Sequence, residues 1–149
     1  MREVRRSALV PYTPLEMYAL VNDVAGYPKF VPFCPAATVL ESSPTSLTAR
    51  LEIARAGLRL SLTTRNALVP GESIHLALVD GPFKALDGRW DFVALKNAAG
   101  EVKGCRIELL VRFEFRSAAL GLVASPLFEA TWDRLVDAFV TRAREVYGG

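Results

Sequence analysis

Hydrophobic residues recur at every second position over most of the middle of the chain. This alternation begins near Ala37 and is interrupted by short groups of turn residues, a pattern typical of strands with one buried face. The strands it predicts are a hairpin of 47–53 and 58–63, then 74–78, 86–95 and 105–116, preceded by a strand at 3–10. We therefore expect a run of antiparallel strands with one wet and one dry face.

Two early segments carry helix signals instead. Thr13 can cap a helix that Pro14 opens at its first position. The stretch that follows, GYPKFVPFC at 26–34, is rich in proline and bulky apolar residues. Its prolines limit it to a short helical turn or irregular chain, so we interpret it as a stiff flap near the end of a sheet.

The longest helix is predicted from Ser125–Pro126 to about Tyr147, with glycines beyond its end. Phe128, Trp132 and Phe139 fall on one apolar stripe of this helix. A helix of this length must lie on a sheet to bury that stripe. Because strands and helices are segregated along the chain, we expect one α+β domain over 1–149, in which a curved antiparallel sheet of about six to seven strands wraps around the long C-terminal helix, with one or two short helices after the first strand.

Composition narrows the classes of function. The 149 residues carry a formal net charge of +2, from 18 basic and 16 acidic residues, so neither the positive field of a nucleic-acid-binding protein nor a disordered acidic chain is indicated, and we expect no DNA partner. Apolar residues make up 51% of the chain, yet no run of about 18 could cross a bilayer. The apolar stretch Ala8–Val10 is too short for a signal peptide, and we expect a cytoplasmic protein, with the inner face of the cell membrane as a second place of action.

Catalytic chemistry is poorly supported by the sequence. His75 is the single histidine and falls on the outer face of its predicted strand, and Cys34 and Cys105 are expected as buried, reduced thiols. There is no phosphate-binding glycine loop and no nucleophile elbow. We predict no catalytic residues, no metal and no required cofactor.

The distinctive residues are aromatic. After the turn Asp80–Pro82, the chain places Gly88, Trp90 and Phe92 on one strand face. A glycine between such residues often marks a bend or a close approach of two backbones. This face can form ordinary core or the wall of a lipophilic pocket beneath the C-terminal helix.

The chain also resembles a known family at several motifs in order. These are YPKFVPFC at 27–34, Thr64–Asn66, DGPFKALDGRWDF at 80–92, FEF at 113–115 and AFVTRAREVYG at 138–148. Together they are similar to the coenzyme Q-binding START-domain family, within the polyketide cyclase/dehydrase-like SRPBCC superfamily. Its members include mitochondrial coenzyme Q-binding proteins and bacterial ribosome-association toxins. Phe33 stands where the family most often has tryptophan.

The resemblance implies a helix-grip fold and a hydrophobic tunnel that holds ubiquinone or another polyprenyl quinone as a bound ligand, in support of respiration. It also implies contact with a membrane or a respiratory complex. Burial of an isoprenoid tail would supply roughly 0.8 kcal/mol for each CH₂ group. The residues expected to contact the ligand are Tyr27, Phe30, Pro32, Phe33, Phe83, Trp90, Phe92, Phe128, Trp132 and Phe139.

Two other functions stay open. As in the toxin branch, the chain could bind the large ribosomal subunit and block subunit joining, which favours a basic face for RNA. Such a face requires the first strand and the 46–66 hairpin to display their arginines together; these are Arg2, Arg5, Arg6, Arg50, Arg55, Arg59 and Arg65. An enzyme is the third reading, because related helix-grip domains include cyclases and aromatases.

Overall fold

The computed structural model describes residues 1–148. The helices are α1 (Pro14–Asn22), the 3₁₀ helix η1 (Val24–Lys29) and α2 (Ala118–Tyr147). The strands are β1 (Arg2–Val10), β2 (Ala36–Ser42), β3 (Ser46–Arg55), β4 (Leu58–Val69), β5 (Ser73–Asp80), β6 (Phe83–Lys96) and β7 (Val102–Phe115). The predicted segregation of one strand, two short helices, a run of strands and a final helix is confirmed.

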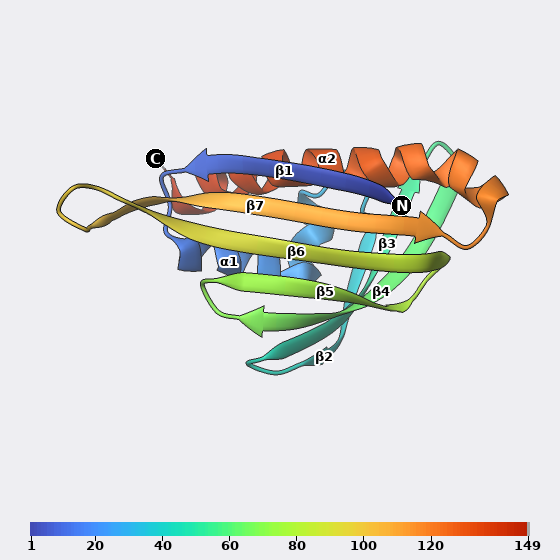
Figure 1. Ribbon diagram of the computed structural model, residues 1–149, viewed down its shortest axis with the longest axis horizontal. Coiled ribbons are helices and arrows are strands. Elements are labelled where there is room, and N and C mark those ends of the chain that lie inside the picture. The colour runs from blue at the N-terminus through green and yellow to red at the C-terminus, as the bar shows by residue number, and fades with distance from the viewer. Residues whose placement is uncertain (149) are drawn as a thin grey trace.

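All seven strands form one antiparallel sheet in the order β1-β7-β6-β5-β4-β3-β2. Consecutive strands from β2 to β7 are neighbours, and β1 closes the far edge by pairing along β7. Figure 1 shows α2 running along the sheet on the side opposite the viewer, with α1 near the C-terminal end of α2. This is the helix-grip arrangement that the sequence predicted.

The alternation of apolar residues places one face of each central strand against α2. Trp90 and Phe92 of β6 and Ile107 of β7 lie in the buried core. Gly88 precedes Trp90 on this face, and a Cβ atom there would lie 2.9 Å from Cδ1 of Leu76 on β5. The absence of a side chain at Gly88 therefore leaves room for the Leu76 side chain of the neighbouring strand, rather than for a close approach of two backbones.

The long helix starts earlier than the sequence indicated. It begins at Ala118, and the Ser117 side chain caps it by accepting a hydrogen bond from the Leu120 N–H. The predicted start at Ser125–Pro126 is wrong because Pro126 lies inside the helix on its exposed face. Leu122, whose carbonyl loses its partner through the missing N–H of Pro126, is 81% exposed, so water can replace that bond.

Polar contacts fix α2 along its length. Near its first half, Arg2 and Arg6 of β1 form ion pairs with Glu129 (2.7 Å) and Asp133 (2.6 Å). At its C-terminal end, the Tyr147 hydroxyl donates a hydrogen bond to the Glu16 carbonyl oxygen at 2.8 Å. The helix is thus tied to β1 near its middle and to α1 at its C-terminal end. No helix among residues 1–148 is long and apolar enough to span a membrane.

Candidate functional site

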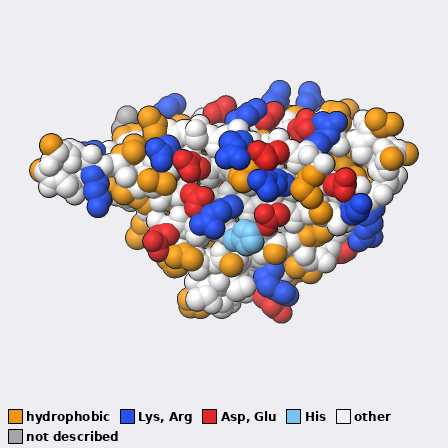
Figure 2. All heavy atoms as spheres, viewed as in Figure 1, with side chains coloured by type: hydrophobic (Ala, Val, Ile, Leu, Met, Phe, Trp, Pro, Cys, Tyr) orange, Lys and Arg blue, Asp and Glu red, His pale blue; other side chains and the backbone are white. Residues whose placement is uncertain are grey.

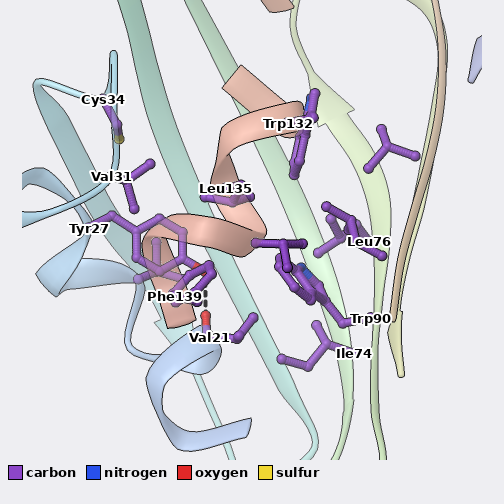
Figure 3. Close-up of a cluster of buried hydrophobic side chains, with 14 of the residues drawn as sticks. Val21, Tyr27, Val31, Cys34, Ile74, Leu76, Trp90, Trp132, Leu135 and Phe139 are labelled. Atoms are coloured by element: carbon purple, nitrogen blue, oxygen red, sulfur yellow. Dashed lines mark hydrogen bonds between the residues drawn. The ribbon is translucent and has the colours of Figure 1, made fainter. Parts of the chain in front are cut away.

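The segment from η1 to β2 lies over one end of the space between α2 and the sheet. Tyr27 of η1 points inward, where its ring packs edge-to-face on Phe139 of α2 at 5.4 Å and its hydroxyl donates a hydrogen bond to the Val21 carbonyl oxygen. Figure 3 shows this bond and the neighbouring inward side chains of Val31 and Cys34. The single O–H donor of Tyr27 is therefore already used within the protein.

The two phenylalanines of this segment take different positions. Phe30 packs on the rings of Tyr27 (6.1 Å) and Phe139 (5.3 Å), so it extends the aromatic core. Phe33 is half-buried and lies beneath the guanidinium groups of Arg55 and Arg134, whose Cζ atoms are 4.7 and 5.3 Å from its ring centre. Neither phenylalanine lines the cavity beneath the segment.

That cavity is small. It occupies about 40 Å³ between η1, the inner face of β3 to β6 and the middle of α2 (Figure 3). Its lining residues are Val24, Tyr27, Val31, Cys34, Ala49, Leu51, Ile53, Leu62, Thr64, Asn66, Leu76, Trp90, Thr131, Trp132 and Leu135. A volume of this size holds a few water molecules, whereas pockets for drug-sized ligands measure about 300–1,000 Å³.

A few of the residues that line this apolar cavity carry polar groups. The Thr64 hydroxyl donates a hydrogen bond to Asn66 Oδ1 at 2.8 Å, and both side chains are buried. The indole Nε1–H of Trp132 is buried and has no hydrogen-bond partner among the described residues. A buried donor without a partner is uncommon and is a group that a water or a ligand oxygen could satisfy.

Thr64 and Asn66 were not among the predicted contact residues. The signal was present, because the alternation Leu58, Leu60, Leu62 on β4 continues in steps of two to both residues. Both residues were missed because they are polar, although they lie on the same inner face. The spacing of two along β4 therefore indicates this wall better than residue type does.

The remaining predicted contact residues lie apart from the cavity. Phe83 and Phe128 belong to an aromatic cluster with Phe113 and Phe115 beneath the first half of α2; the Phe83 and Phe128 ring centres are 4.9 Å apart. Phe92 stacks on Trp90 at 6.3 Å and meets Tyr18 of α1.

Of the ten predicted residues, Tyr27, Trp90 and Trp132 line the cavity. Phe139 supports its wall by packing on Trp90 at 5.4 Å. Pro32 lines a separate surface hollow together with Phe30.

The cavity offers little acid–base chemistry. Burial raises the pKa of Tyr27, and burial raises the pKa of the Cys34 thiol to about 11. A thiol with such a pKa is almost wholly protonated near pH 7 and is a weak nucleophile. No His, Asp or Glu is among the lining residues. Within residues 1–148 no group of three His, Cys, Asp or Glu side chains is arranged to hold a metal ion.

The outer face of the sheet is covered by ion pairs. Figure 2 shows acidic and basic side chains interspersed over β1, β7, β6 and β5, with the histidine among them. Arg106 pairs with Glu108 (2.8 Å), Arg112 with Glu3 (3.1 Å), and His75 with Asp87 (2.7 Å). His75 is exposed, as predicted. The face as a whole carries mixed charge.

The seven arginines of the predicted basic face do not come together. β7, β6 and β5 separate β1 from β4 and β3, so Arg2, Arg5 and Arg6 lie across the sheet from the hairpin arginines. Arg2 and Arg6 pair with acids of α2, and Arg59 pairs with Glu52 at 2.7 Å. The condition for one continuous basic face is therefore not met, because three strands lie between the two groups of arginines.

Relatives with known names match this chain over almost its whole length. The ribosome association toxin RatA of Vibrio cholerae is 44% identical over 148 residues, which cover 99% of each chain. The mitochondrial coenzyme Q-binding protein COQ10 of Drosophila melanogaster is 30% identical over 145 residues, covering 96% of this chain and 59% of the relative. Neither name describes an enzyme.

A solved structure and a family model also match this chain. The crystal structure of the ZhuI aromatase/cyclase from Streptomyces superposes with a TM-score of 0.79 over 99% of this chain and 98% of that one, at 22% identity, which shows a shared fold. Residues 10–140 match the family described as polyketide cyclase/dehydrase and lipid transport. The chain therefore belongs to the polyketide cyclase/dehydrase and lipid transport family, in which it is similar both to ribosome association toxins and, at lower identity, to coenzyme Q-binding proteins.

Proposed function

We propose that this protein associates with the large ribosomal subunit and blocks the joining of the two subunits. The observation that carries the proposal is the 44% identity, over 99% of each chain, to a ribosome association toxin. The corresponding identity to the coenzyme Q-binding relative is 30%. The proposed place of action is the cytoplasm, where bacterial subunits meet.

The filled interior supports a function at the surface. A quinone carrier of this fold needs a tunnel beneath the long helix, yet the space there is about 40 Å³. Trp90, Phe139 and Tyr27 fill it with packed aromatic rings. Because side chains fill most of the interior, an internal ligand would need more space, whereas a macromolecule that binds at the surface would not.

A non-catalytic role is part of the same proposal. Catalysis by a helix-grip cyclase needs an acid or base that exchanges protons near neutral pH. Among the cavity residues, Tyr27 and Cys34 both have raised pKa values, and the remaining polar groups are amide, hydroxyl and indole groups. These groups can hold a ligand by hydrogen bonds without transforming it.

Sucrose-gradient sedimentation of ribosomes with and without the purified protein tests the proposal. We expect added protein to reduce the peak of joined ribosomes, to increase the free-subunit peaks and to sediment with the large subunit. Unchanged subunit association at low salt, with the protein remaining at the top of the gradient, would overturn it.

A polyprenyl quinone or a similar lipid is the second candidate ligand. The unpartnered Nε1–H of Trp132, a residue that lines an apolar cavity, favours a ligand with a carbonyl oxygen and an apolar body. Tyr27, Trp90 and Trp132 would contact it, and the segment carrying Phe30, Pro32 and Phe33 would have to move to admit it. Ubiquinone is the specific ligand we propose here, because the coenzyme Q-binding relative is similar over 96% of this chain.

Fluorescence provides a direct test of this second function. Both tryptophans of the chain, Trp90 and Trp132, line the cavity, so any ligand that enters it must change their emission. We expect quinone in lipid extracts of protein purified from a quinone-producing host. Absence of quinone there, together with unchanged emission on addition of ubiquinone, would remove this candidate.

A further inference from the structure

Four cations surround the two half-buried phenylalanines of the proline-rich segment. Arg55 of β3 and Arg134 of α2 lie over the Phe33 ring, and Arg142 of α2 lies over the Phe30 ring with its Cζ atom 5.3 Å from the ring centre. Lys29 is exposed on the same segment and lines one hollow with Phe30 and Arg134. We call this cluster the Phe33 platform; its members are Lys29, Phe30, Phe33, Arg55, Arg134 and Arg142.

The cations of the platform are free of acidic partners. Within residues 1–148, none of the ion pairs within 4.0 Å involves Lys29, Arg55, Arg134 or Arg142, whereas seven other arginines are paired; these are Arg2, Arg5, Arg6, Arg59, Arg89, Arg106 and Arg112. The platform therefore differs from the outer sheet face, where arginines such as Arg106 and Arg112 are neutralised by a neighbouring carboxylate. A stacked guanidinium keeps its in-plane N–H donors directed away from the ring, where they match the oxygens of a phosphate.

Phe33 is held in its position at a conformational cost. Its φ angle is 62°, a left-handed backbone conformation that costs a bulky residue roughly 1–3 kcal/mol. The Phe33 carbonyl oxygen accepts a hydrogen bond from the Ala54 N–H at 2.8 Å, which anchors the segment to β3 directly beside Arg55. The fold thus holds a strained aromatic residue at the point where two unpaired arginines meet.

Two carboxylates beside the platform reduce its positive charge. Asp137 and Glu145 of α2 line the same hollow, of about 510 Å³, as Lys29, Phe30 and Arg134. Within the hollow, Lys29 and Arg134 match these two acids in number, and Arg55 and Arg142, which lie outside it, bring the cations of the platform to four. The favourable field is therefore local, as expected for a protein that contacts a phosphate backbone at one place.

We infer that the Phe33 platform is the surface that contacts RNA, through phosphodiester groups bound by Arg55 and Arg134. This inference rests on the proposed function, because a ribosomal partner presents RNA phosphates. Unpaired guanidinium groups stacked on aromatic rings bind phosphates with little loss of side-chain entropy, since the ring already orients the donors.

The test compares two double variants of equal charge. Arg55→Gln with Arg134→Gln removes the platform arginines, while Arg106→Gln with Arg112→Gln removes two paired arginines from the outer sheet face. Binding is measured to purified large ribosomal subunits by sedimentation and to a fluorescein-labelled single-stranded uridine oligonucleotide by anisotropy. Both measurements cover salt concentrations from about 50 to 200 mM. Thermal unfolding of each variant checks that it is folded.

For the platform variant we expect about tenfold weaker binding for each arginine. The slope of log affinity against log salt should fall by about one for each lost phosphate contact. The control variant should bind like the wild type. Asp137→Asn with Glu145→Gln should strengthen binding, an opposite sign that general damage to the fold cannot produce.

The outcomes separate the inference from the proposed function. If the wild type binds subunits and both arginine variants bind as tightly as the wild type, the ribosomal function stands and the inference about the platform is overturned. If the platform variant loses affinity with an unchanged salt slope, the contact is not to phosphate and the inference is overturned. If the wild type binds the oligonucleotide through the platform but not the subunits, the proposed function fails and the RNA-binding surface stands. If it binds neither, both fail.

Discussion

The hydroxyl of Tyr27 donates a hydrogen bond to the backbone carbonyl oxygen of Val21, which ties the 3₁₀ turn to the end of α1. Replacement of Tyr27 by phenylalanine removes this donor while retaining the ring contact with Phe139. We expect the free energy of unfolding to fall by about 1–2 kcal/mol, because the bond is buried. The matched control Tyr147→Phe removes an exposed bond to Glu16 and should cost less. Urea denaturation of both variants checks the order, and an equal loss would contradict it.

The two phenylalanines of the proline-rich segment should respond differently to substitution. Phe30→Ala removes a ring that packs on Tyr27 and Phe139, so we expect a loss of about 3 kcal/mol in the free energy of unfolding. Phe33→Gly removes a half-buried ring and at the same time relieves the unfavourable φ of 62°. Its net effect should stay within about 1 kcal/mol. A larger loss for Phe33→Gly than for Phe30→Ala in urea denaturation would show that Phe33 belongs to the core.

Two glycines of the sheet should differ in their tolerance of alanine. A Cβ at Gly104 would lie 2.4 Å from the Val10 carbonyl oxygen, and that backbone cannot retreat without breaking the pairing of β1 with β7. We expect Gly104→Ala to cost about 3 kcal/mol. Gly88→Ala meets the flexible Leu76 side chain, which lies beside the cavity and can shift, so about 1 kcal/mol is expected.

Gly121→Ala serves as the control for both sheet glycines. Gly121 lies in α2, and a Cβ there would have the Cβ of Phe115 on β7 as its nearest neighbour, at 3.7 Å. Alanine favours the helix, so the free energy of unfolding should rise by about 0.5–1 kcal/mol. Thermal or urea denaturation should therefore rank the stabilities as Gly121→Ala, wild type, Gly88→Ala, Gly104→Ala, and a reversal of the last two would refute the account of the close approaches.

The early start of α2 leads to a pair of opposite predictions. Pro126→Ala restores an N–H that can bond within the helix at an exposed position, so it should raise the free energy of unfolding by about 1–2 kcal/mol. Ser117→Ala removes the cap that bonds to the Leu120 N–H and should lower it by about 1 kcal/mol. A neutral Ser117→Ala would indicate that the first turns of α2 contribute little, and helical circular dichroism measures the same change independently.

The buried thiols make stability sensitive to alkaline pH. Burial raises the pKa of both Cys34 and Cys105 from 9.0 to about 11. Because the unfolded chain loses these protons first, the stability they contribute is fully present below about pH 9 and is lost as the pH rises toward about 11. As the pH rises from about 9 to about 11, the urea concentration at the midpoint of unfolding should fall further for the wild type than for a Cys34→Ala, Cys105→Ala variant. This variant controls for the titration of lysine and tyrosine side chains. Parallel curves would mean that the thiols are not protected in the folded state.

Much of the fold could be predicted from the sequence because the signals are local. The alternation along β6 and β7 fixes which side chains face α2, and the order of strands and helices identifies the layers. Thr13 and Pro14 mark the start of α1, where the capping box is formed with Glu16. The start of α2 escaped prediction because Pro126 gives a helix-start signal at a position where solvent tolerates its missing N–H.

The site is the part that tertiary structure decided. The apolar character of 26–34 indicated contact with the interior, and Tyr27 and Val31 do line the cavity. The opposite surroundings of Phe30 and Phe33 depend on Phe139, Arg55 and Arg134, which lie far away in the sequence.

The sequence by itself determined the family, the helix-grip layers and the apolar inner face, since each of these follows from the spacing and type of neighbouring residues. Only the tertiary structure decided that the space beneath α2 is about 40 Å³ and that the arginines near Phe33 have no acidic partner within 4.0 Å among residues 1–148. Cavity volume and charge pairing depend on the distances between side chains of different elements. Those distances are set when β3, the proline-rich segment and α2 pack together, and no local pattern records them.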